Sequence, residues 1–386
     1  MRRLAALVLA LLLLMSAGCA SLFDTEAYSE EDYEVPADTA GVEEADAISN
    51  YAALRRAIAR LVADHAEAAE LQFQNYDGSI SQDLSTACWE VKSSTALGAF
   101  AVDYISYDLS RIVSYYQAVV YITYKRSEYQ VSAREAVENT AGMRARLEKA
   151  LRAGETYIVM ELPAATLAGD TVREAVEQAY YGDPLVCPVL PAVEAGVYPE
   201  TGVSRIVEVT MDYGLDPAGL LKRRAELKAA AGALAAECRA AGEAPEALLR
   251  ALCGYLALRC RTDEAAPQTA WDALVAGTSG SEGEAMALLA VCQMLDIPCQ
   301  IVFGRYEGEP HEWNIVTLGE DSCHVDVSHW TAGAEPVFLA GDEELWGAYW
   351  WDTSQYPACR SRSGVSGASS GEPSPEARSG DGILSA

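Results

Sequence analysis

The chain has 386 residues, and 50% of them are hydrophobic, so it can bury a core and contain about two or three domains. Its 57 acidic and 28 basic side chains give a formal net charge of -29. A field of that sign repels phosphate backbones, which argues against nucleic acid as a partner, and the apolar content excludes a disordered chain.

The N-terminus, MRRLAALVLALLLLMSAGCA, has a basic start, an apolar run and small residues before Cys19. This pattern is typical of an export signal, and the apolar run is too short to span a bilayer comfortably. The stretch SAGC resembles the lipobox of bacterial lipoproteins, in which the cysteine receives lipid and becomes the new N-terminus. We therefore predict a signal peptide at residues 1–18, lipid attachment at Cys19, and a mature protein anchored on the outer face of a bacterial cell membrane. An ordinary cleaved signal with a coincidental cysteine is the alternative.

The segment after Cys19 is acidic. From Ala20 to Asn50 it has ten acidic residues and no Lys or Arg, with little apolar periodicity. Such a composition cannot build a core, so we predict a solvated, disordered tether at residues 19–50.

Two stretches with an offset of 87 residues follow the same pattern and predict a duplicated α/β region, residues 51–136 and 137–225. LQFQN from Leu71 aligns with IVMEL from Ile158, and AVVYITYKR from Ala118 aligns with RIVEVTMDY from Arg205. Each unit is predicted as a helix, a strand, a second helix, a turn-rich segment and a β-branched strand. The predicted helices cover residues 51–69 and 81–97 in the first unit, and 141–153 and 168–181 in the second. The alternative is two α/β segments that merely look alike.

The C-terminal region, residues 226–359, is predicted as a separate domain with leading helices. A long Ala-rich helix is expected from Pro217 to about Ala241, and leucines at helical spacing after Pro245 indicate another. Residues 360–386 are rich in Ser, Gly, Pro and Glu, which predicts a disordered tail.

Candidate chemistry lies in SGSEGEAMALLAVCQMLDIPCQIVFGR, HEWNIVTL and SCHVDVSH. Gly280 and Ser281 open a predicted helix over residues 282–295, a buried strand follows, and two more strands come after it. His311 and Asp326 are equally far from a turn at residues 318–319. A hairpin there would bring the imidazole and the carboxylate close together.

This arrangement, over about residues 244–359, resembles the transglutaminase-like superfamily, whose core is related to papain-type cysteine peptidases. The resemblance rests on WDALVAG, SEGEAMALLAVCQMLDIPCQIVFG, HEWNIV and HVDVS. It implies an α+β fold, a general-base position at His311, an orienting position at Asp326, and Ser281 in place of the nucleophilic cysteine.

The serine changes the chemistry that the site can perform. A thiol at a helix N-terminus can become a standing thiolate, whereas a hydroxyl must lose its proton to His during attack. Ser281 has a simpler interpretation as a helix N-cap, with Glu284 completing a capping box. His311 and Asp326 could likewise be a buried pair that only holds the strands together.

Three hypotheses remain open. In the first, the chain is a membrane-anchored, transglutaminase-like binding or scaffolding module without thiol catalysis, whose ligand is a peptide, a protein or the cell wall. In the second, it is an active hydrolase or acyltransferase that uses a Ser281-His311-Asp326 triad on peptide or amide bonds. In the third, the duplicated region carries the function. We favour the first, in which the chain is not an enzyme.

Neither a metal nor an organic cofactor is predicted. Some animal relatives use calcium, but no dedicated loop is present, and no cysteine or histidine spacing indicates zinc. If Cys19 carries lipid, nine cysteines remain, so at least one is unpaired within the chain. Five tryptophans could line a ligand groove or belong to the core: Trp313, Trp330, Trp346, Trp350 and Trp351.

Overall fold

The structure is a computed structural model that describes residues 47–163, 169–331 and 336–361. The predicted signal peptide, Cys19, most of the predicted tether and nearly all of the predicted tail lie outside these residues. The predicted tether ends too late in the sequence. Ile48, inside its predicted range, is buried and forms a bridge with Phe73. Asn50 then caps the first described helix through a bond from the Ala53 N–H to its side chain.

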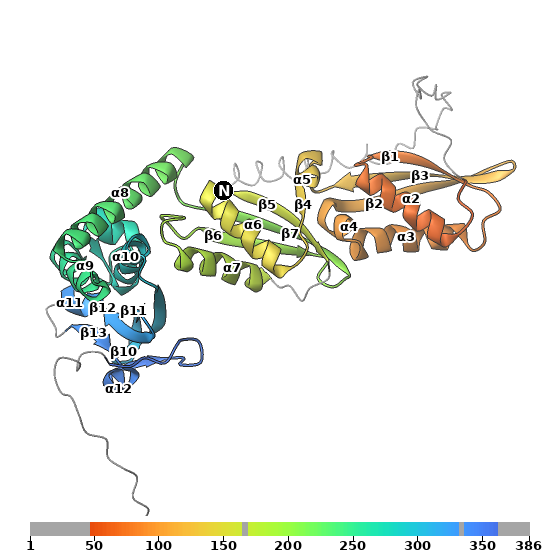
Figure 1. The fold of residues 1–386 in the computed structure, drawn as a ribbon. Coiled ribbons are helices and arrows are strands. Elements are labelled where there is room, and N and C mark those ends of the chain that lie inside the picture. Colours follow the sequence, from red (N-terminus) through yellow and green to blue (C-terminus); the bar gives the residue numbers. More distant parts are fainter. Residues whose placement is uncertain (1–46, 164–168, 332–335, 362–386) are drawn as a thin grey trace, which may run out of the picture. The chain divides into compact units, whose positions relative to one another are not determined.

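The first unit is a three-stranded antiparallel sheet in the order β1-β3-β2 (Figure 1). Its elements are α2 (Tyr51–Ala63), β1 (Ala68–Phe73), α3 (Ile80–Ser94), α4 (Ala96–Ala101), β2 (Val102–Ile112) and β3 (Tyr115–Tyr124). α2 and α3 pack on one face of the sheet, where Leu54, Ile58 and Leu84 are fully buried.

The second unit repeats this arrangement. Its elements are α5 (Glu128–Ser132), β4 (Arg134–Ala136), α6 (Thr140–Ala153), β5 (Tyr157–Pro163), α7 (Gly169–Gly182), β6 (Ala192–Tyr198) and β7 (Ser204–Asp212). The order β4-β5-β7-β6 contains the order of the first sheet, with β5, β7 and β6 in the places of β1, β3 and β2. α6 and α7 cover one sheet face through an apolar core that includes Leu147, Met160 and Val176.

The prediction of a turn-rich segment before the last strand is wrong in both units. Those segments contain β2 and β6, each forming a hairpin with the strand that follows. Both are edge strands with few buried residues, two in β2 and none in β6, so their sequences lack the buried apolar run that marks β3 and β7. The second sheet also starts earlier than residue 137, because β4 pairs in parallel with β5.

The C-terminal region is a five-stranded antiparallel sheet, β13-β12-β11-β10-β14, with helices packed against it. Its first half consists of α8 (Pro217–Ala241), α9 (Pro245–Arg259), β8 (Arg261–Thr262), the π-helix η1 (Asp272–Ala276), β9 (Thr278–Ser279) and α10 (Ser281–Met294). Its second half consists of β10 (Cys299–Tyr306), β11 (Glu309–Leu318), β12 (Asp321–Asp326), α11 (Val327–Thr331), β13 (Val337–Ala340), α12 (Asp342–Leu345) and β14 (Tyr349–Trp351). α8 runs unbroken through residues 225 and 226, where the sequence predicts a domain boundary.

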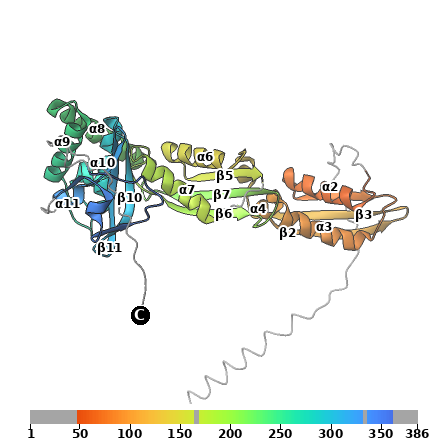
Figure 2. The same cartoon turned by 60° about the horizontal axis from the view of Figure 1, so that its bottom comes forward.

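α10 is the central element of this region. It packs against β10 and β11 on one side and against α8 and α9 on the other (Figure 2). Nearly every residue from Ser281 to Cys292 is buried, as expected for a helix that is apolar all round. The α+β fold class is confirmed. The packing of α10 against β11 holds the first residues of α10 beside that strand.

The tryptophans divide between core and surface. Trp313 and Trp351 are buried in an apolar cluster between the sheet and its C-terminal cover, and Trp330 packs edge-on against Phe338. Trp346 and Trp350 are exposed. All nine cysteines of the described residues are free thiols. Within those residues, no helix combines the length and apolar character needed to cross a membrane.

Candidate active site

Ser281 is the first residue of α10, and it does not cap the helix. Gly280 is the N-cap and makes no side-chain cap bond. The Ser281 hydroxyl instead donates to Oε2 of Glu312 at 2.9 Å, and Glu284 accepts a bond from Thr262 at 2.8 Å. The capping-box interpretation is therefore wrong, because both side chains have partners outside the helix.

The β11–β12 hairpin brings the predicted base and its partner together. Nε2 of His311 lies 2.7 Å from Oδ2 of Asp326, and the turn falls between Leu318 and Asp321. The prediction that a hairpin brings these two side chains together is confirmed.

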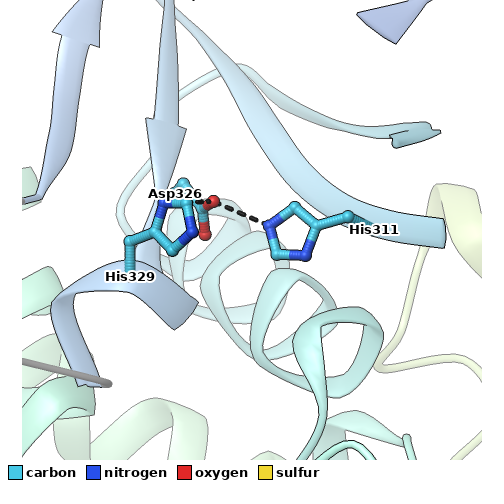
Figure 3. Close-up of side chains that lie close together, drawn as sticks. All are labelled: His311, Asp326 and His329. Carbon is cyan, nitrogen blue, oxygen red and sulfur yellow. Dashed lines mark hydrogen bonds and ion pairs between the residues drawn. The ribbon is translucent and has the colours of Figure 1, made fainter. Parts of the chain in front are cut away.

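Asp326 is fully buried and accepts more hydrogen bonds than the sequence indicated. Tyr349 OH donates to its Oδ2 at 2.7 Å, and both the hydroxyl and the N–H of Ser328 donate to its Oδ1 at 2.6 and 3.0 Å. Nδ1 of His329 lies 3.3 Å from Oδ2, so two imidazole rings lie beside this carboxylate (Figure 3). The sequence could have indicated His329 as a neighbour of Asp326, because it follows Asp326 by three residues. Tyr349 could not be found in this way, because it comes from β14.

These contacts set the charge of the pair. Burial acts to lower the pKa of His311, but the hydrogen bond and the negative charge of Asp326 outweigh it and raise the pKa above its ordinary value. Burial acts to raise the pKa of Asp326, and the bond and charge of His311 hold it below its ordinary value. The pair therefore favours an imidazolium beside a carboxylate.

Ser281 is not joined to this pair. Among the described residues its hydroxyl bonds only with Glu312, and Nδ1 of His311 has no hydrogen-bond partner. Successive side chains of a strand point to opposite faces, so Glu312 and Asn314 face α10 while His311 and Trp313 face the other side. Asn314 accordingly donates to the Ala285 carbonyl at 3.0 Å. Ser281 thus bonds with Glu312, the neighbour of His311 in the sequence, and forms no hydrogen bond with His311 itself.

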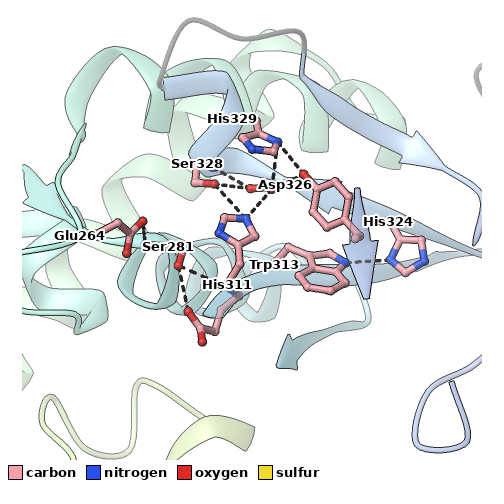
Figure 4. Close-up of polar contacts among 10 residues, drawn as sticks. Glu264, Ser281, His311, Trp313, His324, Asp326, Ser328 and His329 are labelled. Carbon is pink, nitrogen blue, oxygen red and sulfur yellow. Dashed lines mark hydrogen bonds and ion pairs between the residues drawn. The ribbon is translucent and has the colours of Figure 1, made fainter. Parts of the chain in front are cut away.

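A second carboxylate binds the backbone at the start of α10. The Ser281 N–H donates to Oε1 of Glu264 at 3.0 Å (Figure 4). The Glu282 N–H donates to Oε1 of Gln268 at 3.3 Å. Gly280 allows this approach, because a Cβ there would lie 2.5 Å from the Glu264 carboxylate. Both side chains come from the loop between β8 and η1, and nothing in the sequence marked them.

The two carboxylates work against an anion at Ser281. Burial raises the pKa of Glu312, opposed by the Ser281 hydrogen bond and by His311, and the nearby charge of Glu264 raises it further. Ser281 itself is only 1% exposed. A negative charge that develops here meets acidic side chains instead of free N–H donors.

A second histidine–aspartate pair lies deeper in the sheet. Nδ1 of His324 accepts from the Trp313 indole at 2.9 Å, so its Nε2 carries the proton and donates to Asp342 at 2.9 Å. Burial lowers the pKa of His324 more than Asp342 raises it, so this ring is neutral and structural.

In two groups of three residues, the atoms that could bind a metal ion lie within 4.8 Å of one another. The first group is His311, Asp326 and His329, and the second is His324, Asp342 and Cys359. In the second group His324 has no free lone pair, because both nitrogens already hydrogen bond. In the first group the same atoms bond one another and Tyr349. We therefore assign no metal ion to either group. That the protein needs no cofactor stays a prediction.

Comparisons with known proteins agree with this architecture. Residues 232–346 match the sequence profile of the transglutaminase-like superfamily. Residues 232–346 are therefore a transglutaminase-like domain within a longer chain.

Two solved structures are similar in part. One is the crystal structure of a TGase, with 11% identity and a TM-score of 0.27, over 75% of this chain and 80% of that one. The other is a proposed cysteine protease from Cytophaga hutchinsonii, with 13% identity and a TM-score of 0.25, over 38% of this chain and 66% of that one. No curated protein sequence matches the chain significantly.

Proposed function

We propose that this chain is an exported, lipid-anchored protein of a bacterial cell membrane, and that its transglutaminase-like domain binds a ligand without catalysing acyl transfer. The observation that carries the loss of catalysis is the position of Ser281. Its hydroxyl donates to Glu312, and its N–H donates to Glu264.

Acyl transfer builds negative charge on an oxygen beside the nucleophile, and free N–H donors at a helix N-terminus stabilise that charge. Losing one such donor costs about a factor of 10² to 10³ in rate. Here the N–H of the nucleophile position is held by a carboxylate, which adds repulsion to the lost donor. A hydroxyl also needs a base in contact with it, and His311 forms no bond with Ser281.

One observation favours the alternative, a hydrolase that uses Ser281, His311 and Asp326. The ring of His311 is oriented by its bond to Asp326, and its Nδ1 has no partner among the described residues, which is what a general base needs when the ring is neutral. For this alternative to hold, Glu264 and Glu312 must move away when a substrate binds.

A fluorophosphonate probe separates the two functions, because it labels only an activated serine hydroxyl. The full-length protein and Ser281→Ala are treated in parallel, and the adduct is mapped by mass spectrometry. We expect no adduct at Ser281. An adduct there that disappears in His311→Ala would support the hydrolase and overturn the binding function.

The anchor rests on the N-terminal sequence and is tested separately. We expect cells fed a labelled fatty acid to label the wild-type chain and not Cys19→Ala. Labelling that persists in this variant would contradict the lipid attachment.

A further inference from the structure

A cavity of about 710 Å³ opens beside the second α/β unit and the C-terminal sheet. Glu174, Glu177 and Tyr181 of α7 line one wall, and Cys299, Ile301 and Phe303 of β10 line another. The two walls share an apolar core, in which Tyr180 and Val176 are buried together with Leu289 and Ile301. The same core therefore extends behind both walls of the cavity.

The β10 wall is an open sheet edge. β10 pairs with β11 along its whole length, but β14 pairs only with residues 304–306 on the other side. Within the described residues, no strand pairs with Cys299 or Ile301 on that side. An unpaired strand edge of this kind is a template for another extended chain.

The backbone at this edge points into the cavity. The Pro298 carbonyl accepts from Thr317 on β11, whereas the N–H groups of Phe303 and Glu307 donate on the opposite side, to Tyr356 OH and the Ala348 carbonyl. Alternate residues of an antiparallel strand direct their N–H and C=O to opposite edges. Cys299 and Ile301 therefore present both groups to the open edge.

The other wall is acidic. Neither Glu174 nor Glu177 forms an ion pair with a described residue, and none of the residues that line the cavity is basic. Tyr181 continues this wall toward the candidate site, because its hydroxyl donates to Glu282 at 2.8 Å. Its ring also packs edge-on against Phe303 at 4.7 Å. The cavity thus combines strand-pairing groups, aromatic surface and unpaired negative charge.

We infer that this cavity binds an extended segment of a partner polypeptide that carries Lys or Arg, which adds as a strand to the open edge of β10 at Cys299–Ile301. The basic side chains lie against Glu174 and Glu177. The acidic segment before residue 50 of this chain is a poor occupant, because its charge has the same sign as the wall. The inference rests on the proposed function in one respect: the segment is held and not cleaved.

The test uses the full-length protein and three fluorescent peptides of about seven residues, a length that covers this edge at about 3.3 Å per residue. One alternates lysine and valine, one alternates glutamate and valine, and one is the lysine peptide with alternate backbone nitrogens methylated. Fluorescence anisotropy gives the affinity. We expect binding of the first peptide only, because the second has the wrong charge and the third cannot pair as a strand.

Variants locate the site. Glu174→Gln with Glu177→Gln should weaken the lysine peptide about tenfold at low salt, and Glu67→Gln with Glu70→Gln, on exposed residues of the first unit, should not. Cys299→Pro removes one edge N–H and should weaken binding about fivefold, while Cys299→Ala keeps that N–H and should bind normally. Circular dichroism verifies that each variant is folded.

The outcomes are distinct. Equal binding of the methylated peptide, full binding by Cys299→Pro, or no binding at all would overturn the docking inference and leave the proposed function intact. Cleavage of the peptide, seen by its mass, would overturn the proposed function. A photoreactive benzoylphenylalanine placed at Phe303 should cross-link to the lysine peptide. Cross-links only to this chain's own C-terminal segment would show that the chain itself occupies the cavity, and would overturn the inference.

Discussion

The two sides of the candidate site differ in what they offer to catalysis. The hairpin side carries a histidine whose ring is oriented by a buried aspartate, as in a catalytic histidine–aspartate pair. The helix side carries a hydroxyl and an N–H that are both bonded to carboxylates, Glu312 and Glu264. The two sides therefore differ: the histidine is oriented by an aspartate, whereas the hydroxyl and N–H of Ser281 are both bonded to acidic side chains.

This difference lies between two elements of one site, the β11–β12 hairpin and the start of α10. Asp326 bonds with His311, Tyr349 and Ser328, so the hairpin side has a structural reason to exist without catalysis. On the helix side the Ser281 N–H is bonded to a carboxylate, which competes with an oxyanion for that donor. We therefore expect substitutions at the start of α10 to change reactivity and substitutions at the hairpin to change stability.

The largest expected effect is on stability and comes from the hairpin side. Asp326→Ala removes the common acceptor of His311, Tyr349 and Ser328, and breaking such a buried pair should lower the free energy of unfolding by about 3 kcal/mol. Urea denaturation measures it. Asp342→Ala is the matched control, because Asp342 is partly exposed and bonds a neutral ring, and it should cost less. Equal losses of unfolding free energy in the two variants would contradict the distinction between the charged pair and the neutral pair.

The neutral pair gives a second, smaller effect. Trp313→Phe removes the indole N–H that fixes the tautomer of His324 and should cost about 1 to 2 kcal/mol. The ring signals of His311 in an NMR titration should keep their midpoint, because its bond to Asp326 is untouched. A shifted His311 midpoint would mean that the two pairs are coupled.

The pH dependence of stability tests the charged pair. The pKa of His311 is raised above 6.5, so its contribution is complete below pH 6.5 and is lost as the pH rises through the raised value. The pKa of Asp326 is held below 3.8, so its contribution is complete above pH 3.8 and is lost as the pH falls through the lowered value. The stability advantage of wild type over His311→Gln should therefore shrink above pH 6.5. An advantage that grows with pH would contradict the assigned charge.

The smallest effect is expected at the exposed tryptophans. Trp346 and Trp350 are 69% and 65% exposed, so replacing either by Ala should change the free energy of unfolding by less than about 0.5 kcal/mol. Thermal melts would detect a larger change, which would show that these rings pack against something in solution.

Part of this site could be read from the sequence. The spacing of His311 and Asp326 about one turn predicts that the two side chains lie close together on one face. In the observed register Leu318 pairs with Asp321, so the contact is diagonal, two residues from a direct cross-strand pair. The long helices were also predictable from their apolar spacing and from Pro217 and Pro245 at their starts. These features depend on local pattern alone.

Other parts depend on contacts between distant segments. Glu264 and Gln268 belong to a loop without periodicity, and Tyr349 reaches Asp326 from β14. The alternative interpretation of Ser281 as an N-cap is wrong, because its hydroxyl donates to Glu312 on β11. Glu312 stands next to His311 in the sequence, and the alternation of a strand could have assigned it to the α10 face.

The most direct measurement of the central claim is the reactivity of a thiol placed at the position of the nucleophile. Ser281→Cys is treated with iodoacetamide across a range of pH, alone and together with Glu264→Gln and Glu312→Gln, and the modified peptide is followed by mass spectrometry. We predict that the introduced thiol alone reacts no faster below neutral pH than a free thiol with a pKa of about 8.5, and that removing both carboxylates increases its rate there. Fast reaction of Ser281→Cys alone at acidic pH, abolished by His311→Ala, would contradict the account.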